Sequence, residues 1–484
     1  MIPLSARTLG SLGDRVDVPE YDRGAVTAGV VHLGVGGFHR AHQAAFHDRL
    51  MNEGGPLDWG ICGVGVLERD RGTIEALQAQ DGLYTLLAKA PGGEVVARVI
   101  GSIVELLLAP DEPEAVLEKL AAPTTRLVTL TITEGGYLVD DATGVFDAEQ
   151  PDVARDLAAA AGEPPRTAFG LVVEGLRRRR ERGLEPFTVL SCDNLQGNGE
   201  IARTAFGTFA ALRDEELGAW VREHVPFPSS VVDRITPATT EADRRTVREL
   251  LDIEDRAPVV CEPFAQWVID AGAAGALPPY DAVGVRLVDD VLPHELMKLR
   301  LLNAGHQAVA HAGRLCGHTY VHEAARDPDI RAFLDAYLDH EAVPTIHGVP
   351  EDELRAFRAA VPERFGNPAV GDTLERLATD ASDRIPKFLL PVIRERLKAG
   401  GDVRRAAAVI AAWTVSCDEL PLTDRRAEEL AARARGRADD PLVFVRDRAV
   451  FGDLADDDAF TTAYRAALQS VDTAGVRATL ASLA

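Results

Sequence analysis

Short apolar runs alternate with amphipathic segments through the first 290 residues, and this alternation restricts the fold more than any other feature of the sequence. A strand buried on both faces reads as a nearly continuous apolar run, and a crossover helix between two such strands reads as an amphipathic segment. The expected strands are 28–36, 59–66, 97–106, 126–133 and 186–193. The pattern therefore predicts parallel β-α-β units in a Rossmann-type, doubly wound α/β fold.

Two further extended runs, 258–269 and 281–290, follow these units, and we expect them to extend the same sheet. Later in the chain, amphipathic segments are separated by turns that contain proline or glycine, and strand signals are almost absent. We therefore place a domain boundary near residue 290. Residues 1–290 are predicted to form a Rossmann-type nucleotide-binding domain with added strands, and residues 291–484 a mostly α-helical domain that supplies the substrate site.

The 484-residue chain carries a formal net charge of −24. Nucleic-acid binding depends on neutralising phosphates with lysine and arginine, so a strongly acidic chain argues against nucleic acids and anionic membranes as partners. No run of about 18 to 20 apolar residues is present, and the N-terminus lacks the apolar core of a secretory signal. We expect a cytoplasmic protein whose partner is a small molecule.

The stretch GVGGFHRAHQ, residues 34–43, follows an expected strand and precedes a helical pattern. This is the context of a dinucleotide-binding loop, in which two glycines let the backbone approach a pyrophosphate and a third allows close helix packing. Gly34, Gly36 and Gly37 fit the turn, but His39 stands in the third place. The context predicts a nucleotide-binding loop with an unusual ending.

The two histidines of this loop, His39 and His42, have the spacing of a metal-binding pair. A zinc site needs three or four ligands, and no further ligand stands at a recognised spacing. A metal site is therefore the weaker interpretation. We expect the two histidines to pack in the core or to join Arg40 at the phosphates.

The second expected strand is followed by two acidic residues, Glu68 and Asp70. An acidic side chain at this point can accept hydrogen bonds from the adenosine ribose hydroxyls, and it repels a 2′-phosphate. The sequence therefore predicts NAD as the cofactor in preference to NADP. The separation of 34 residues between Gly34 and Glu68 exceeds the usual spacing of about 20 and requires a longer first crossover.

The segment HELMKLRLLNAGHQ, residues 294–307, mixes polar residues into a leucine-rich helix face. At about 100° per residue, an α-helix puts three polar side chains within about 140° of Lys298, on the same arc as the leucines: Glu295, Asn303 and His306. An amphipathic helix normally separates polar from apolar residues. The mixture predicts a lined cavity in which Lys298 is partly desolvated.

Partial desolvation disfavours the charged form of a lysine, which would allow Lys298 to act as a general base. Oxidation of a secondary alcohol needs such a base, and it needs hydrogen-bond donors for the developing alkoxide. Asn303 is one candidate donor, and Asn194 is another because it follows an expected strand, at the edge where open α/β sheets bind ligands. The sequence has no Tyr-x-x-x-Lys, no His-Glu-x-x-His and no cysteine-histidine set for catalytic zinc, so a metal-free lysine mechanism remains.

Six segments in one order resemble the motifs of the polyol-specific long-chain dehydrogenases: GVGGFHRAHQ, TEGGY (133–137), SCDNLQGNG (191–199), VVDRITPATT (231–240), EPFAQWVI (262–269) and KLRLLNAGHQ (298–307). The resemblance extends from residue 28 to beyond residue 380 and is strongest for the mannitol branch of that family. It implies NAD-dependent, metal-free interconversion of D-mannitol and D-fructose by a monomeric enzyme. It also implies that His39 belongs to a family variant of the loop.

The resemblance implies a role for each matching residue of the catalytic site. Lys298 would be the general base, and the amides of Asn194 and Asn303 would polarise the substrate oxygen. Glu295 would lie on a proton path from Lys298 to solvent. Other substrate hydroxyls would be held by His306, Asp233 and Arg376. His306 would also complete the catalytic set.

The same resemblance implies a cofactor site in the first domain. The expected cofactor contacts are Gly34, Gly36, Gly37, Phe38, His39, Arg40, Glu68, Asp70 and Glu134. One departure from the family pattern lies in the second domain, where Ala304 and Gly305 precede His306 in place of the usual Gly-Ser. This small change should leave the catalytic set intact.

Several alternatives remain open within the family: D-arabinitol or sorbitol dehydrogenase, and fructuronate or tagaturonate reductase. A uronate enzyme must accommodate a substrate carboxylate, for which an arginine is a natural partner, and Arg376 alone does not exclude that reading. A mannitol 1-phosphate dehydrogenase fits less well, because a shorter chain and a different opening loop are expected there. Outside this class, a non-catalytic NAD-binding sensor would predict loss of the polar residues in 298–306, but Lys298, Asn303 and His306 are all present.

Overall fold

The computed structural model describes residues 1–140, 143–160 and 162–484. The chain divides into two compact units. The first unit consists of Met1–Lys89 and Glu94–Val291, and the second consists of Ala90–Gly93 and Leu292–Ala484.

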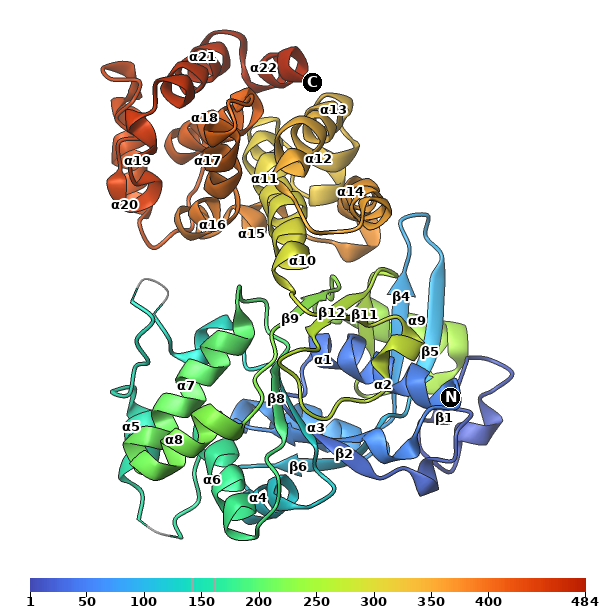
Figure 1. The fold of residues 1–484 in the computed structure, drawn as a ribbon. Coiled ribbons are helices and arrows are strands. Elements are labelled where there is room, and N and C mark those ends of the chain that lie inside the picture. The colour runs from blue at the N-terminus through green and yellow to red at the C-terminus, as the bar shows by residue number, and fades with distance from the viewer. Residues whose placement is uncertain (141–142, 161) are drawn as a thin grey trace. The chain divides into compact units, whose positions relative to one another are not determined.

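A five-stranded parallel sheet forms the centre of the first unit (Figure 1). Its strands are β2 (Ala28–Leu33), β3 (Gly60–Gly65), β6 (Ile103–Leu108), β7 (Leu127–Leu130) and β8 (Thr188–Ser191). They lie in the order β6-β3-β2-β7-β8, and every neighbouring pair is parallel. The strand order reverses between β2 and β7. Open α/β sheets bind ligands at such a reversal, beyond the carboxyl ends of the strands.

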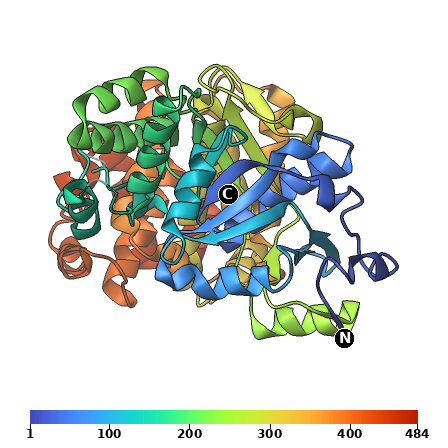
Figure 2. The same ribbon diagram turned by 90° about the horizontal axis from the view of Figure 1, so that it is seen from below.

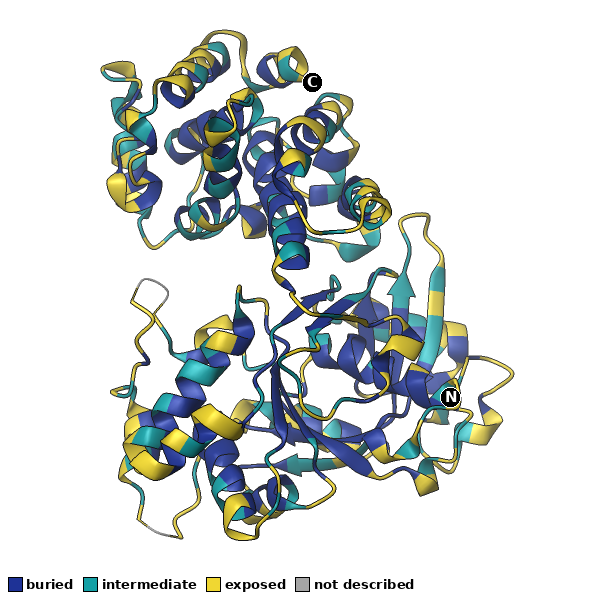
Figure 3. Cartoon of the chain, in the orientation of Figure 1, coloured by how far each residue is buried: buried dark blue, intermediate teal, exposed yellow. Residues whose placement is uncertain are grey.

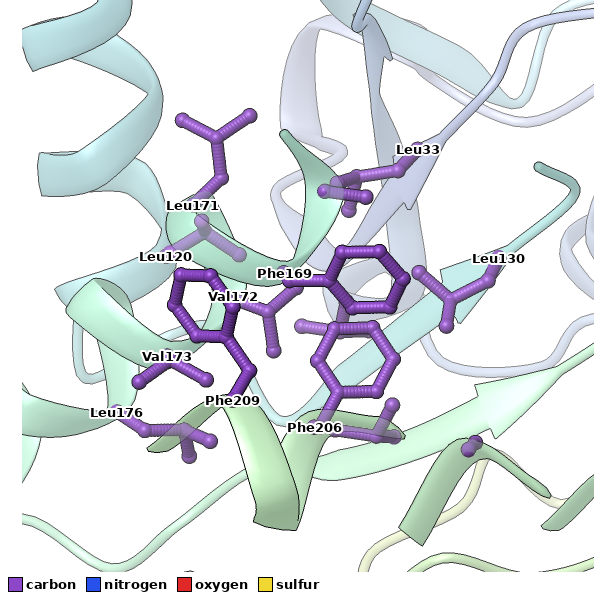
Figure 4. Packing of buried hydrophobic residues seen from close by; sticks show 14 of the residues in the cluster. Leu33, Leu120, Leu130, Phe169, Leu171, Val172, Val173, Leu176, Phe206 and Phe209 are labelled. Carbon is purple, nitrogen blue, oxygen red and sulfur yellow. The ribbon is translucent and has the colours of Figure 1, made fainter. Parts of the chain in front are cut away.

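Helices cover both faces of this sheet (Figure 2): α2 (Gln43–Asn52), α3 (Arg71–Gln78), α4 (Pro113–Ala121) and α6 (Ala168–Glu181). On β2, Leu33 packs into a buried apolar cluster with α4 and α6, whereas Val30 packs into a second cluster with α2 and α3. Figure 4 shows Leu33 and Leu130 of the sheet near Phe169 and Phe206 of the helices. Because successive residues of a strand point to opposite faces, burial on both sides confirms the doubly wound fold.

The other α-helices of the first unit are α1 (Gly37–Ala41), α5 (Pro151–Ala158), α7 (Asn198–Arg213), α8 (Glu215–His224) and α9 (Glu241–Leu251). Helices α1 and α2 both lie between β2 and β3, which confirms the expected longer first crossover. Helix α9 begins at a capping box: the Thr240 hydroxyl accepts from the N–H of Asp243, and the Asp243 carboxylate accepts from the N–H of Thr240.

The expectation that 258–269 and 281–290 extend the main sheet is wrong. They contain three short strands, β11 (Val259–Cys261), β12 (Gln266–Asp270) and β13 (Arg286–Val288). β11 pairs with β4 (Tyr84–Lys89) of the hairpin that β4 forms with β5 (Val95–Ile100), and β12 lies between β9 (Ser230–Asp233) and β13. Pro263, which has no N–H to donate, stands between β11 and β12. An apolar run indicates a buried strand but does not specify its partner.

The expected strand 97–106 is also two strands, because β5 ends at Ile100 and β6 begins at Ile103. Gly101 lies at this change of sheet, where its N–H donates to the Asp48 carboxylate at 2.9 Å and an added Cβ would lie 2.6 Å from Pro19. A further parallel pair joins β1 (Ile2–Pro3) to β10 (Ile253–Glu254). Figure 3 shows that the strands of the five-stranded sheet are mostly buried, whereas the β4–β5 hairpin is partly exposed.

The second unit is built from helices, and between residues 292 and 484, all of which are described, the only strand-like pairing is the bridge between Tyr320 and Thr373. Helix α11 packs against α15 and α18. No helix in the described part of the chain is long and apolar enough to span a membrane. The helices are α10 (Leu292–Met297), α11 (Ala304–Leu315), α12 (Val321–Arg326), α13 (Pro328–Tyr337), α14 (Glu351–Phe365), α15 (Leu374–Ala378), α16 (Ala381–Phe388), α17 (Leu390–Lys398), α18 (Arg404–Glu419), α19 (Ala427–Arg435), α20 (Arg448–Phe451), α21 (Asp458–Ala474) and α22 (Val476–Leu483).

Candidate active site

Three predicted site segments of the first unit follow strands of the parallel sheet. Gly34 follows β2, Glu134 follows β7 and Asn194 follows β8. The carboxyl ends of parallel strands lie at one edge of a sheet, so these segments share that edge. Both Glu134 and Asn194 are exposed there.

The turn after β2 requires glycine at its first position. Gly34 has a φ of +99°, and a Cβ at this residue would lie 2.2 Å from the Thr131 carbonyl oxygen. The Thr131 hydroxyl donates to the Gly34 carbonyl at 2.6 Å, which ties the turn to the end of β7. At Gly36 and Gly37 an added Cβ would meet no atom closer than 3.7 Å. The first glycine therefore avoids a clash, and the next two leave the open space that a cofactor phosphate needs.

The two histidines of the loop lie in the core. His39 is fully buried and stacks on His32 with 3.4 Å between ring centroids. Burial lowers the pKa of His39 well below its usual value. His42 donates through Nε2 to the Gln266 carbonyl at 2.8 Å. Among the residues that the structure describes, no group of three or more His, Cys, Asp or Glu side chains could hold a metal ion.

A cavity of about 560 Å³ opens beside this loop within the first unit. Gly37, Phe38 and Arg40 contribute to its wall. Arg40 is 8% exposed, and its guanidinium donates to the carbonyl oxygens of Gly36 at 3.3 Å and Ala257 at 2.5 Å. The volume suits a small-molecule ligand. The predicted cofactor residues Phe38 and Arg40 thus border a cavity of suitable size.

The acidic pair after β3 is engaged by other groups. Both carboxylate oxygens of Glu68 accept from the Arg71 guanidinium, at 2.6 and 2.9 Å. One oxygen of Asp70 accepts from the N–H groups of Val66 and Leu67, each at 2.9 Å. Neither Glu68 nor Asp70 is part of the wall of the cavity beside the loop.

Asp193, the residue before Asn194, organises the edge of the sheet. Its carboxylate accepts from the N–H groups of Ile132 and Thr133, at 3.0 and 2.9 Å, and from the Tyr137 hydroxyl at 2.9 Å. Burial raises the pKa of Asp193 to about 6. Thr133 has a φ of +71°, which is unusual for a β-branched residue and marks local strain. Asp193 thus holds the turn that presents Glu134, a role that sequence reasoning missed.

Asn198 fixes the other side of the same edge. It is fully buried, its amide N–H donates to the Ser230 carbonyl at 2.8 Å, and its amide oxygen accepts from the Ser230 N–H at 2.9 Å. These paired bonds join the segment after β8 to β9. Asp233, a predicted substrate residue, is the buried last residue of β9. Asn198 therefore helps to position both Asn194 and Asp233.

In the second unit, residues Lys298–Asn303 form a π-helical segment between α10 and α11. The Ala304 N–H donates to the Leu299 carbonyl five residues earlier. The α-helical estimate of about 140° between Lys298 and Asn303 does not apply to a π turn, which holds more residues per turn and so brings residue i+5 closer to the face of residue i. Such segments occur frequently at functional sites.

The polar residues of this segment lie in a largely apolar setting. Glu295 and Lys298 are 7% and 8% exposed, with Leu299 and Leu302 also buried. Asn303 is partly exposed, and its side chain makes no hydrogen bond within the described part of the chain. The segment therefore carries buried ionisable groups and an amide that remains available to a ligand.

Other side chains keep this segment in place. Arg300 is buried and donates to both carboxylate oxygens of Glu395, at 2.8 and 2.6 Å. The His306 ring is partly exposed and stacks on Phe365 with 4.1 Å between centroids. Arg376, the remaining predicted substrate residue, lies on α15, and its guanidinium pairs with the Asp372 carboxylate.

Comparison with known proteins places the chain in a family. Residues 28–280 match the mannitol dehydrogenase Rossmann domain, and residues 290–472 match the mannitol dehydrogenase C-terminal domain. The chain belongs to the mannitol dehydrogenase family. Mannitol 2-dehydrogenase of Aspergillus fumigatus is 41% identical over 495 residues, covering 99% of this chain and 98% of the relative. The resemblance that the sequence motifs indicated is confirmed.

Two solved structures cover almost the whole chain. The ternary complex of Pseudomonas fluorescens mannitol 2-dehydrogenase with NAD and D-mannitol is 40% identical, covers 100% of this chain and 99% of its own, and has a TM-score of 0.84. A substrate-free D-sorbitol dehydrogenase is 36% identical, covers 99% of this chain and 100% of its own, and has a TM-score of 0.91. The fold is therefore shared with dehydrogenases of two related polyols.

Proposed function

We propose that this protein interconverts D-mannitol and D-fructose by metal-free hydride transfer. The chain is an NAD-dependent polyol dehydrogenase. The observation that supports the finer proposal is the π-helical segment Lys298–Asn303, which begins at the buried Lys298 and ends at Asn303. An alcohol oxidation needs a base and a hydrogen-bond donor at one oxygen atom, and this segment offers both.

The residues present fit NAD. The turn at Gly34 has a conformation that excludes a side chain, and Phe38 and Arg40 border a cavity of about 560 Å³. Arg40 is a buried cation that the anionic pyrophosphate would complement. When bound, NAD takes the hydride from C2 of the polyol.

Lys298 is proposed to accept the proton of the C2 hydroxyl through its neutral amine. The side-chain N–H groups of Asn194 and Asn303 then donate to the alkoxide oxygen as its negative charge develops. Neutral amides suit this role, because they stabilise the anion without titrating themselves. In the reverse direction the Lys298 ammonium returns the proton to the ketose oxygen. Glu295, three residues before Lys298 and equally buried, is proposed to pass the proton that Lys298 takes up during oxidation towards solvent.

Three side chains are proposed to hold the remaining hydroxyls of the substrate. Asp233 would accept hydrogen bonds from them and Arg376 would donate to them, whereas His306 would donate or accept according to its tautomer. The ion pair of Arg376 with Asp372 bears on the choice of substrate. A guanidinium that is already paired with a carboxylate suits a neutral polyol better than the carboxylate of a uronate.

Lys298→Ala tests the assignment of the base. We expect kcat for mannitol oxidation to fall by about two to four orders of magnitude, the usual contribution of a general base, while NADH affinity stays unchanged. Arg300→Lys is a control on the same segment, because it disturbs the ion pair with Glu395 without removing the base. Retention of most of the turnover by Lys298→Ala would contradict the assignment.

A substrate panel tests the reaction itself. Mannitol, sorbitol, arabinitol, fructose and fructuronate are compared with NAD or NADH as appropriate, and we expect the highest kcat/KM values for mannitol and fructose. D-Sorbitol is the second candidate polyol, because the D-sorbitol dehydrogenase has the higher of the two TM-scores. A higher kcat/KM for fructuronate would refute the proposal, and NADH binding without turnover of any substrate would indicate a sensor.

A further inference from the structure

The cavity beside the Gly34 loop is lined by four arginines from separate parts of the first unit. Arg40 comes from α1 and Arg69 from the turn after β3. Arg244 comes from α9, and Arg256 from the segment before β11. No aspartate or glutamate among the described residues contributes to the wall of this cavity. In a chain with a net charge of −24, such a gathering of cations marks a site for an anion.

None of these four arginines forms an ion pair with a described residue. Arg40 donates only to carbonyl oxygens, and its guanidinium lies 5.4 Å from the centre of the Tyr84 ring. Arg244 donates to the Arg256 carbonyl at 2.8 Å. The side chains of Arg69 and Arg256 make no hydrogen bond within the described part of the chain. By contrast, Arg71 nearby forms ion pairs with the carboxylates of Glu68, Glu75 and Asp111.

The four guanidinium groups carry more positive charge than the pyrophosphate of NAD can neutralise. Burial lowers the pKa of Arg40, the nearby Asp255 carboxylate raises it, and the like charge of Arg244 lowers it, so the two guanidinium groups repel each other. A pyrophosphate brings about two negative charges, which would leave about half of the four positive charges unmatched. A phosphomonoester adds about 1.5 to 2 negative charges at neutral pH. Together, the pyrophosphate and the phosphomonoester carry about as much negative charge as the four arginines carry positive charge.

Position also favours a phosphomonoester. In this type of fold the residues just after the second strand face the adenosine ribose, and an arginine there accommodates a 2′-phosphate. Arg69 lies at this place and borders the cavity. The neighbouring carboxylates, which would repel a phosphate, are taken up by other partners: Glu68 by Arg71, and Asp70 by main-chain N–H groups.

We propose that the arginine cavity binds the adenosine 2′-phosphate, so that the protein takes NADP(H) in addition to NAD(H). Arg69 and Arg244 are the residues that distinguish the two cofactors, and Arg40 serves both. This proposal rests on the proposed function only in placing a dinucleotide at the Gly34 loop.

The test measures binding, so it does not depend on turnover. The affinities of the wild-type protein for 2′,5′-ADP and 5′-AMP are obtained by competition with NADH fluorescence, and NADPH and NADH are titrated directly. We expect 2′,5′-ADP to bind about tenfold or more tightly than 5′-AMP, as charge-assisted hydrogen bonds imply. Arg69→Ala and Arg244→Ala should each remove most of this difference, and Arg69→Lys should keep part of it.

Arg245→Ala is the matched control, because Arg245 is an exposed neighbour of Arg244 on α9 that does not border the cavity. It should leave the preference for 2′,5′-ADP intact. Equal binding of 2′,5′-ADP and 5′-AMP would overturn the proposal. So would an equal loss of NADH and NADPH affinity in Arg69→Ala and Arg244→Ala, since the arginines would then serve the pyrophosphate alone. Displacement of NADH by inorganic phosphate as effective as by 2′,5′-ADP would show a general anion site and overturn it too.

If the protein turned over no polyol with NAD, the proposed function would fail while these binding ratios could still be measured. Conversely, mannitol oxidation with NAD but no preference for 2′,5′-ADP would leave the proposed function standing and remove this inference. The two proposals can therefore fail separately.

Discussion

Asp193 offers a direct test of how the edge of the sheet is held together. Its pKa rises from an ordinary value of 3.8 to about 6, with burial as the largest cause. Between these values the native state binds more protons at this site than the unfolded state does. The stabilisation is therefore complete below about pH 4 and is lost as the pH rises through about 6. At about 1.4 kcal/mol per pKa unit, it amounts to about 3 kcal/mol.

Asp193→Asn removes this titration and keeps the size of the side chain. At neutral pH the variant avoids the burial of a negative charge, but its amide cannot accept from all three donors that face Asp193, which costs about 1 to 3 kcal/mol. We expect similar stabilities of the two proteins near pH 7. The stability advantage of the wild-type protein over the variant should be about 3 kcal/mol larger near pH 4 than near pH 7.

The assay is urea unfolding at a series of pH values, followed by tryptophan fluorescence, because Trp59, Trp220 and Trp267 all lie in the first unit. Tyr137→Phe serves as the control, since it removes one donor to the carboxylate but leaves the titrating group in place. The stability difference between Tyr137→Phe and Asp193→Asn should therefore change with pH in the same way as the difference between the wild-type protein and Asp193→Asn. A stability difference between wild type and Asp193→Asn that stays flat from pH 4 to pH 7 would refute the reasoning.

Three further predictions concern single side chains. Asn303→Ala should lower kcat about 10²- to 10³-fold, the usual cost of losing one donor to an oxyanion, without changing NADH affinity in a fluorescence titration. Gly34→Ala should lower the unfolding free energy by about 1 to 3 kcal/mol and weaken NADH binding, because its φ of +99° and the nearby Thr131 carbonyl exclude a Cβ; unchanged binding would contradict this. Burial raises the pKa of Glu341, which accepts from two N–H groups at the start of α18, to about 7. Glu341→Ala should therefore lower the unfolding free energy by about 1 to 3 kcal/mol near pH 5, as measured by urea unfolding. The loss should be smaller near pH 8, because the wild-type protein must then bury an ionised carboxylate.

Most of the main sheet could be predicted from the sequence because its central strands are buried along their whole length, whereas the edge strand β6 is partly exposed and its sequence runs on from that of β5. β2, β3 and β7 are apolar on both faces, and helices separate them along the chain, so periodicity and order are sufficient. The smaller sheets could not be predicted in the same way. The middle of β12 is as buried as β2, but its partners β9 and β13 follow from a chain reversal that no local pattern encodes.

At the candidate site, too, the sequence predicts which residue types are present but not how they are arranged. Lys298 and Asn303 could be predicted as site candidates from polar residues on a leucine face, but the π-helical backbone that carries them could not. A single π turn produces no hydrophobic period that a sequence pattern would show, so an α-helical wheel does not describe this segment. Asp193 was missed for a different reason, since an aspartate after a strand is common and only its three donors show its role.

The prediction of NAD as cofactor is confirmed, but the contacts predicted for Glu68 and Asp70 show most clearly why residue type alone is insufficient. Glu68 and Asp70 favour NAD on the assumption that their carboxylates face the ribose. In the structure each carboxylate has other partners, and the cavity wall carries Arg69 instead. Charge acts on a ligand through the groups left uncompensated at the site, and those depend on every neighbouring ion pair. Discrimination between NAD and NADP should therefore follow the unpaired arginines, and exchanging Glu68 should affect the preference less than exchanging Arg69.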